Sequence, residues 1–514
     1  MNIIDENNLL NILNTSLVTR NWNDIYDNLN PKTFCIIKSR QLFKVLAKIA
    51  EIIVNKENDI PDKLKIILLK CLGNSCLNVC THTDYDLDNA ECGEYCKKLY
   101  ANLAEDTSEF QYELQEKNIC FPYNGIAEWT VDYIILNCDV TLSEEQVQVL
   151  RLCIQFLCNL FTFACNNENS SQCKSIKNYL NGTTFQNAII KFICFEDISI
   201  ARAACMFVHN ALKKFDQDYF TWNDKIQVCS QLLKKVEDLQ SAKDALLYLL
   251  NQANIFKSVY EDISIENKLY LLQIIYEEAQ DIIYQHEKSD TGFTFCEKLI
   301  NFLSDRFCKR SDLILKTKDT YLNNFEPMEV IILLDILGVL TSEITDKLYI
   351  IQNNKSLLIN CCYLLKSLHM CGKGSDNYFT SIQRLSDVAP STQKKEYDLE
   401  HHPAFGFKAG LIRVIGNMSY KNKTCQDLIR ETDTIPLLLD CCNIDARNPL
   451  IMQWIILAIR NLCEENLENQ EVIHNSTKIG VMDNTILKEM GLTLQENENG
   501  KSIGIVPLSR NINQ

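Results

Sequence analysis

The chain has 514 residues, a formal net charge of −16, 15 glycines and 9 prolines. Glycine and proline together make up about 5% of the residues, against about 12% in an average protein, which argues against turn-rich β-sandwiches and barrels and favours long helices. The acidic balance argues against nucleic-acid binding, because neutralising phosphates requires a basic surface.

Hydropathy and cysteine usage bear on location and on metal chemistry. No window approaches the ~20 apolar residues that a membrane helix needs, and the first residues lack the apolar stretch of a secretory signal. We therefore expect a cytoplasmic protein without membrane insertion, whose 24 cysteines are mostly small buried hydrophobic residues. The chain has no C-x-x-C pair, P-loop or H-E-x-x-H, so we predict no metal site, no cofactor and no catalytic residue.

Apolar residues recur at helical spacing along most of the chain. Several of these segments carry an asparagine after an apolar turn, as at Asn74, Asn159, Asn210 and Asn251. Buried helices are predicted over residues 64–77, 147–163, 198–212, 242–255, 330–341 and 355–368.

Residues 372–403 interrupt the helical pattern. They are rich in charge, serine, glycine and proline and have little periodicity. We predict a flexible linker or loop there.

A repeated segment follows this interruption. Residues 414–431 read VIGNMSYKNKTCQDLIRE, and residues 458–475 read AIRNLCEENLENQEVIHN, at an offset of 44 residues. A period in the forties is typical of stacked helical repeats. The sequence therefore predicts an all-α, armadillo-like helical-repeat solenoid that winds into a superhelix.

One complete repeat is expected within residues 424–463. It comprises a first helix over 424–431, a second over 436–442 with Thr434 as its N-cap, and a long third helix over 450–463. Three helices in about 40 residues is the armadillo layout.

The tail has a different pattern. Residues 486–490 are a short helix candidate, and residues 492–494 and 503–506 flank Asn-Glu-Asn-Gly, a hairpin turn signal. Because a terminal repeat exposes an apolar face, this tail is expected to cap the stack. The predicted domains are a degenerate armadillo-like array over 1–371, the linker over 372–403, a C-terminal armadillo-like domain over 404–480 and a capping tail over 481–514.

The segments FGFKAGLIRVIGNMSYKNKTCQDLIRE and IPLLLDCCNIDARNPLIMQWIILAIRNLCEENLENQEVI resemble the C-terminal domain of the ataxin-10 family, and KEMGLTLQENENGKSIGI resembles that family's ending. The resemblance covers about residues 404–475 closely and the first ~370 residues only in repeat style. It implies a cytoplasmic protein without catalytic activity, with perinuclear, centrosome or midbody association. It also implies partners, a heterotrimeric G-protein β subunit and an O-GlcNAc transferase, and links to neurite outgrowth, neuronal survival and cytokinesis.

Candidate protein-binding residues lie on the repeated segment. In peptide-binding armadillo proteins a third-helix asparagine holds the ligand backbone, which makes Asn417 and Asn461 candidates. The alternative is that they satisfy backbone groups of a neighbouring repeat, and the tryptophan that importin-type grooves place four residues earlier is absent. The further candidates are Arg413, Lys421 and Trp454.

Two smaller features of the repeat have structural interpretations as well. The pairs Asn422/Gln426 and Asn466/Gln470 are expected to cap and shape the first short helices. Lys408, Arg413, Lys421 and Lys423 form either a basic cluster or a solvated face.

The leading functional hypothesis is a non-enzymatic interaction scaffold on which each repeat adds a strip to an extended surface. The acidic N-terminal array would favour basic partners. The alternative is an armadillo-type regulator of G proteins, either an exchange factor or a chaperone. The sequence leaves the oligomeric state and the binding face open.

Overall fold

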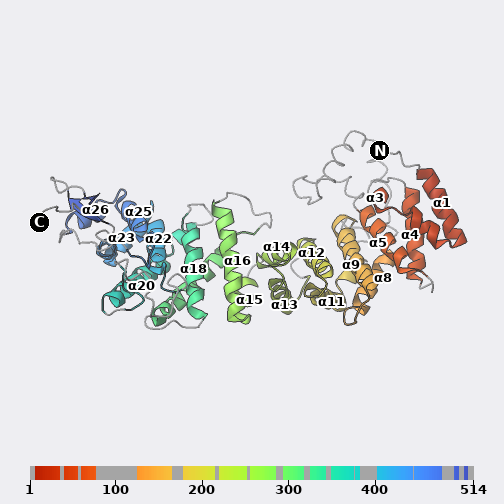
Figure 1. The fold of residues 1–514 in the computed structure, drawn as a ribbon, viewed down its shortest axis with the longest axis horizontal. Coiled ribbons are helices and arrows are strands. Elements are labelled where there is room, and N and C mark those ends of the chain that lie inside the picture. The colour runs from red at the N-terminus through yellow and green to blue at the C-terminus, as the bar shows by residue number, and fades with distance from the viewer. Residues whose placement is uncertain are drawn as a thin grey trace. The chain divides into compact units, whose positions relative to one another are not determined.

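The computed structural model is helical in both halves, with one small hairpin near the C-terminus (Figure 1). No helix among the described residues is long and apolar enough to cross a membrane. The structure describes residues 6–34, 40–55, 60–76, 124–164, 178–214, 219–251, 255–284, 293–317, 325–342, 349–374, 377–382, 402–443, 445–476, 491–496 and 503–507.

The chain divides into two compact units, Met1–Ile255 (unit 1) and Phe256–Gln514 (unit 2). In unit 1, helices α5, α9, α12 and α14 pack one against the next in chain order (Figure 1). Its elements are α1 (Glu6–Thr19), α2 (Trp22–Asn28), α3 (Pro31–Phe34), α4 (Arg40–Val54), α5 (Asp62–Ser75), α8 (Asn124–Leu136), α9 (Glu144–Asn159), the π-helix η3 (Leu160–Ala164), α11 (Thr183–Ile193), α12 (Ile198–Lys214), α13 (Trp222–Leu233) and α14 (Gln240–Leu250).

In unit 2, helices α16, α18, α22 and α25 likewise pack one against the next in chain order. Its elements are α15 (Ile255–Asp262), α16 (Ile265–Tyr284), α17 (Glu297–Arg310), the 3₁₀ helix η4 (Ser311–Thr317), α18 (Glu326–Leu340), α19 (Tyr349–Gln352), α20 (Lys355–Gly374), α22 (Phe407–Ser419), α23 (Lys423–Glu431), α24 (Thr434–Asp440), α25 (Ile451–Cys463), α26 (Leu467–His474), β1 (Leu492–Glu496) and β2 (Ile503–Pro507). A short first helix, a second helix and a 13-residue third helix recur as α19–α20–α22 and α23–α24–α25, although α20 is longer, with 20 residues. This recurrence confirms the armadillo-like repeat.

Buried charge ties helices together at the start of unit 2. The Glu329 side chain on α18 is fully buried, and its Oε1 accepts hydrogen bonds from the Tyr260 hydroxyl and from Arg306 Nε, both at 2.6 Å. These partners lie on α15 and α17. A buried carboxylate needs such partners, so this cluster fixes how α15, α17 and α18 meet.

The three helices of the predicted complete repeat are confirmed as α23, α24 and α25, within two residues at each end. The predicted N-cap of α24 is wrong. Asp433 occupies that position in the left-handed region, with φ 55°, and makes no side-chain capping bond. Thr434 is the first helical residue, and its hydroxyl meets that of Thr432 at 2.9 Å. Asparagine and aspartate tolerate left-handed backbone better than threonine does.

Close contact between α22 and α25 depends on a glycine. A Cβ placed on Gly416 would lie 3.0 Å from the Cβ of Ala458 and 3.1 Å from its Cα. Two small residues thus allow the two third helices to approach backbone to backbone.

The ends of the predicted linker are packed. Phe379 and Ile382 are buried, and the Phe379 carbonyl accepts a bond from the buried Lys408 ammonium at 2.7 Å. The Ile382 N–H donates to Asp445 Oδ1 at 3.0 Å. Residues 383–401 lie outside the described residues, and the domain boundaries drawn from the sequence stay predictions.

The predicted hairpin is confirmed. Strands β1 and β2 pair antiparallel, with Leu494 opposite Ile505 and Glu496 opposite Ile503. The predicted short helix over 486–490 lies outside the described residues, and the capping role of the tail stays a prediction.

Candidate interaction surface

Asparagines of the third helices bind the preceding repeat. In unit 2, Asn417 Nδ2 donates to the Gly338 carbonyl and to Thr341 Oγ1, both at 3.2 Å. Asn461 Nδ2, which is buried, donates to the Gly416 carbonyl at 2.9 Å. Each amide therefore connects its helix to the third helix of the preceding repeat. This is the alternative in which the asparagines satisfy backbone groups of a neighbouring repeat. Contact of either residue with a partner stays a prediction.

The same ladder runs through unit 1. Asn159 Nδ2 on α9 donates to the Gly73 carbonyl on α5 at 3.2 Å, and Asn210 Nδ2 on α12 donates to Cys158 Sγ on α9 at 2.9 Å. The Asn74 amide donates to the Pro31 carbonyl at 2.9 Å. The repeated asparagines thus set the register between neighbouring repeats.

Arg413 and Trp454 meet across the third helices α22 and α25. The guanidinium carbon of Arg413 lies 5.2 Å from the centre of the Trp454 ring, a cation–π contact. Arg413 also acts on the carboxyl group of Asp335 on α18. Burial raises the pKa of this carboxyl by more than the guanidinium lowers it, and the resulting pKa is about 6. Asp335, Arg413 and Trp454 thus form a row across three successive third helices.

The structure does not gather Lys408, Arg413, Lys421 and Lys423 into the basic cluster that was one of the two alternatives. Lys421 lies in the turn between α22 and α23, has left-handed backbone with φ 50°, and places its ammonium 5.2 Å from the Tyr420 ring centre. Lys423 pairs with Asp427 at 3.3 Å. Lys408 is buried, as described above, so the four residues do not form one basic surface.

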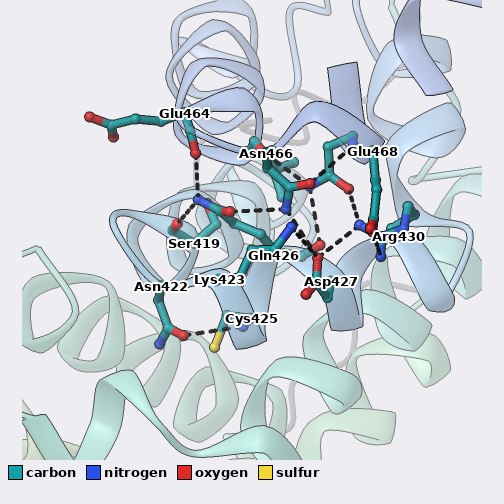
Figure 2. A network of polar contacts seen from close by, with 12 residues as sticks. Ser419, Asn422, Lys423, Cys425, Gln426, Asp427, Arg430, Glu464, Asn466 and Glu468 are labelled. Atoms are coloured by element: carbon teal, nitrogen blue, oxygen red, sulfur yellow. Dashed lines mark hydrogen bonds and ion pairs between the residues drawn. The ribbon is translucent and has the colours of Figure 1, made fainter. Parts of the chain in front are cut away.

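Gln426 is the centre of a polar network between consecutive repeats (Figure 2). Its side chain is buried, and its Nε2 donates to the carbonyls of Ser419, Asn461 and Glu464 at 3.2, 2.9 and 3.3 Å. Its Oε1 accepts from Asn466 Nδ2 at 3.0 Å. One amide therefore satisfies the ends of both third helices, α22 and α25.

Capping residues extend this network, which confirms the capping interpretation of both asparagines. Asn422 Oδ1 accepts from the Cys425 N–H, and Asn466 Oδ1 accepts from the Asn469 N–H, both at 3.2 Å. Gln470, at the position equivalent to Gln426, donates to the Cys463 carbonyl at 2.8 Å.

An ion-pair chain borders the network. Arg430 bonds Asp427 at 2.8 Å and reaches Glu468 on the next short helix at 2.5 Å, as Figure 2 shows. Burial alone would raise the pKa of the Asp427 carboxyl. Hydrogen bonds from Arg430, Asn466 and Lys423 together outweigh this effect, so the pKa is lower than usual. The role of Gln426 between repeats was not predicted, although the glutamine shared by both copies pointed to this position.

One cluster has the outline of a nucleophilic site. Cys441 Sγ lies 3.3 Å from His369 Nδ1, and His369 Nε2 lies 2.7 Å from Asp440 Oδ2. Burial raises the pKa of the Cys441 thiol to about 11, so the thiol stays protonated at neutral pH and is a poor nucleophile. The cluster instead links α20 to α24.

The repeated segment, residues 414–475, lies within a domain that is known from other proteins. The family model for the spinocerebellar ataxia type 10 protein domain matches residues 407–504. Ataxin-10 of Xenopus tropicalis is 30% identical over 381 residues, which cover 73% of this chain and 74% of that protein. Ataxin-10 of Homo sapiens is 39% identical over 171 residues, or 33% of this chain and 34% of that protein.

Among solved structures, an engineered protein aligns with 84% of this chain and 97% of its own length, at 9% identity and a TM-score of 0.28. A likeness at this level adds nothing to the fold assignment, which rests on the helix packing described above. The family model covers the repeated segment, the sequence match to the Xenopus tropicalis protein extends over most of both chains, and the chain therefore belongs to the ataxin-10 family.

Proposed function

We propose that this chain is a non-enzymatic, cytoplasmic interaction scaffold of the ataxin-10 type. It would bind signalling proteins, among them a heterotrimeric G-protein β subunit and an O-GlcNAc transferase, and act in neurite outgrowth, neuronal survival and cytokinesis. The partners, the processes and the location come from the family resemblance.

The observation that supports the proposal is the row Asp335–Arg413–Trp454 on α18, α22 and α25. It spans three repeats, and both Arg413 and Trp454 are partly exposed. Arginine and tryptophan are enriched among the residues that dominate binding energy in protein interfaces. The row also offers a charged and an aromatic group side by side on rigid helices.

Binding of purified partners tests the proposal. The full-length chain is immobilised, and the G-protein β subunit with its γ subunit, or the O-GlcNAc transferase, is passed over it in biolayer interferometry. We expect at least one partner to bind, and Trp454→Ala and Arg413→Ala each to weaken that binding about tenfold or more.

Lys366→Ala is the matched control, because Lys366 is exposed on α20 outside the row. It should leave the affinity unchanged. If neither partner binds, or if both row variants bind as well as the original chain, the proposal is wrong. A nucleotide-release assay on the heterotrimer tests the alternative, since an exchange factor would accelerate release.

A further inference from the structure

The third-helix face of unit 1 has a regular register. The bonds from Asn159 and Asn210 to the preceding helix align the asparagines of α5, α9 and α12 in one row. Residues four positions earlier lie one turn away on the same face. That second row consists of Lys70, Gln155 and Met206.

This face is basic, although the chain as a whole is acidic. Lys70 on α5, Arg151 on α9, and Arg202 and Lys213 on α12 occupy its exposed or half-exposed positions. No aspartate or glutamate follows the first turn of any of these three helices. The expectation that the N-terminal array as a whole favours basic partners therefore does not apply to this face.

Three of these four charges have no acidic partner at ion-pair distance among the described residues. Lys70, Arg202 and Lys213 form no ion pair with the residues that the structure describes, whose ion pairs lie elsewhere. Arg151 differs from them, because it lies near enough to Asp197 to lower the pKa of that carboxyl, and its Nε is buried.

A shallow depression lies in the middle of this face. It has a volume of about 210 Å³ and is lined by Gln155, Cys158, Asn159, Ala203 and Met206. Met206 is 44% exposed. Methionine adapts its shape to apolar ligands, so the depression suits one apolar side chain between positive charges.

We propose that the α5–α9–α12 face binds an extended, acidic segment of a partner protein. One apolar side chain of the segment enters the depression beside Met206, and the carboxylates of the segment pair with the exposed Lys70, Arg202 and Lys213. The proposal rests on the proposed function only in that the ligand is a protein. Its residues lie in unit 1, whereas Asp335, Arg413 and Trp454 lie in unit 2.

Geometry sets the length of the segment. Neighbouring helices pack with axes about 8–10 Å apart, and an extended chain advances about 3.3 Å per residue. About three residues therefore span one repeat, and about nine cross the three helices. An apolar pocket and side-chain amides suit a peptide better than a phosphate backbone, which binds chiefly through clustered positive charge.

Fluorescence anisotropy on the full-length chain tests the proposal. The probe is a labelled peptide of about nine residues, with one central leucine flanked by aspartates and glutamates. We expect it to bind, to bind less tightly as salt is added, and to lose about tenfold or more in affinity with the double variant Lys70→Glu/Arg202→Glu.

Three controls separate the outcomes. Lys44→Glu/Lys48→Glu makes the same charge change at exposed positions of α4 and should leave the affinity unchanged. Met206→Asp should weaken the leucine peptide more than a peptide with alanine in its place. Trp454→Ala in unit 2 should not affect the peptide, so loss of the proposed function leaves this binding intact.

The proposal is overturned if the acidic peptide does not bind, or if a lysine-substituted peptide or a single-stranded RNA of matched length binds as tightly. It is also overturned if the α4 control weakens binding as much as the change on the third-helix face. Circular dichroism of each variant confirms that a lost affinity is not a lost fold.

Discussion

The two copies of the repeat, α22–α23 and α25–α26, have similar backbone conformations but differ in how far their equivalent side chains are buried. The residues that enter the short helices, Lys421 and Glu465, have nearly the same left-handed φ, 50° and 54°. Yet Ile412 on α22 is fully buried, while its equivalent 44 residues later, Ile456, is 62% exposed. The sequence period therefore sets the local conformation, and the following repeat sets burial.

The largest expected difference between the copies concerns this isoleucine pair. Ile412→Ala should lower the free energy of unfolding of unit 2 by about 3 kcal/mol, because it opens a cavity at a fully buried position. Ile456→Ala should change it by less than about 0.5 kcal/mol. Urea denaturation with hydrogen exchange of residues 407–475 measures both, and equal losses would contradict the comparison.

The glutamine pair gives the next largest difference. Gln426→Ala removes the donor shared by three carbonyls and leaves the Asn466 amide with one partner fewer, which we expect to cost about 2 kcal/mol. Gln470→Ala removes one exposed bond and should cost about 0.5 kcal/mol or less. Faster exchange at the amides of α23 and α26 in the first variant only is the expected result.

Position 416 tests the helix contact itself. Gly416→Ala should destabilise unit 2 by about 1 kcal/mol, because the new methyl group presses on the Ala458 backbone. Its equivalent in the next copy is the exposed Arg460, and Arg460→Ala should be nearly neutral. Thermal unfolding followed by circular dichroism distinguishes them, and a stabilising Gly416→Ala would show that α25 can shift outward.

The smallest effect is a pH dependence that we expect only in the first copy. There Arg413 interacts with Asp335, whereas the second copy has Leu457 at the position equivalent to Arg413. Burial raises the Asp335 pKa from 3.8 to about 6. The folded state then binds more protons than the unfolded state between these values, so this carboxyl costs stability as pH rises from about 4 to about 6. The change in melting temperature on Asp335→Asn should therefore be more favourable at pH 7 than at pH 4. An equal change at both pH values would contradict this.

Much of the fold follows from local pattern in the sequence. The 44-residue offset located α22 and α25, and alternating apolar residues around Asn-Glu-Asn-Gly located the hairpin. The repeated asparagines suggested tethers between repeats, and the hydrogen bonds of Asn417 and Asn461 follow that suggestion. Such features depend on neighbours in sequence or on one repeated contact.

Other features depend on which distant groups the fold brings together. Lys408 is buried because the Phe379 carbonyl, 29 residues earlier, accepts its ammonium. Composition places lysine on surfaces, although the equivalent Met452 marked the position as apolar. The basic face of unit 1 was likewise hidden, because its charges come from separate helices and net charge averages them with the acidic remainder.

The anchoring of residues 377–382 and 402–410 has a consequence for how this protein can be altered. Ile382 pairs with Asp445 and Ala446, Gly406 donates to the Arg447 carbonyl, and the Lys408 N–H donates to Asn448. Both anchors therefore meet the same short stretch of chain. A single change within residues 445–448 would therefore release two segments that lie apart in the sequence, so this stretch controls both anchors at once.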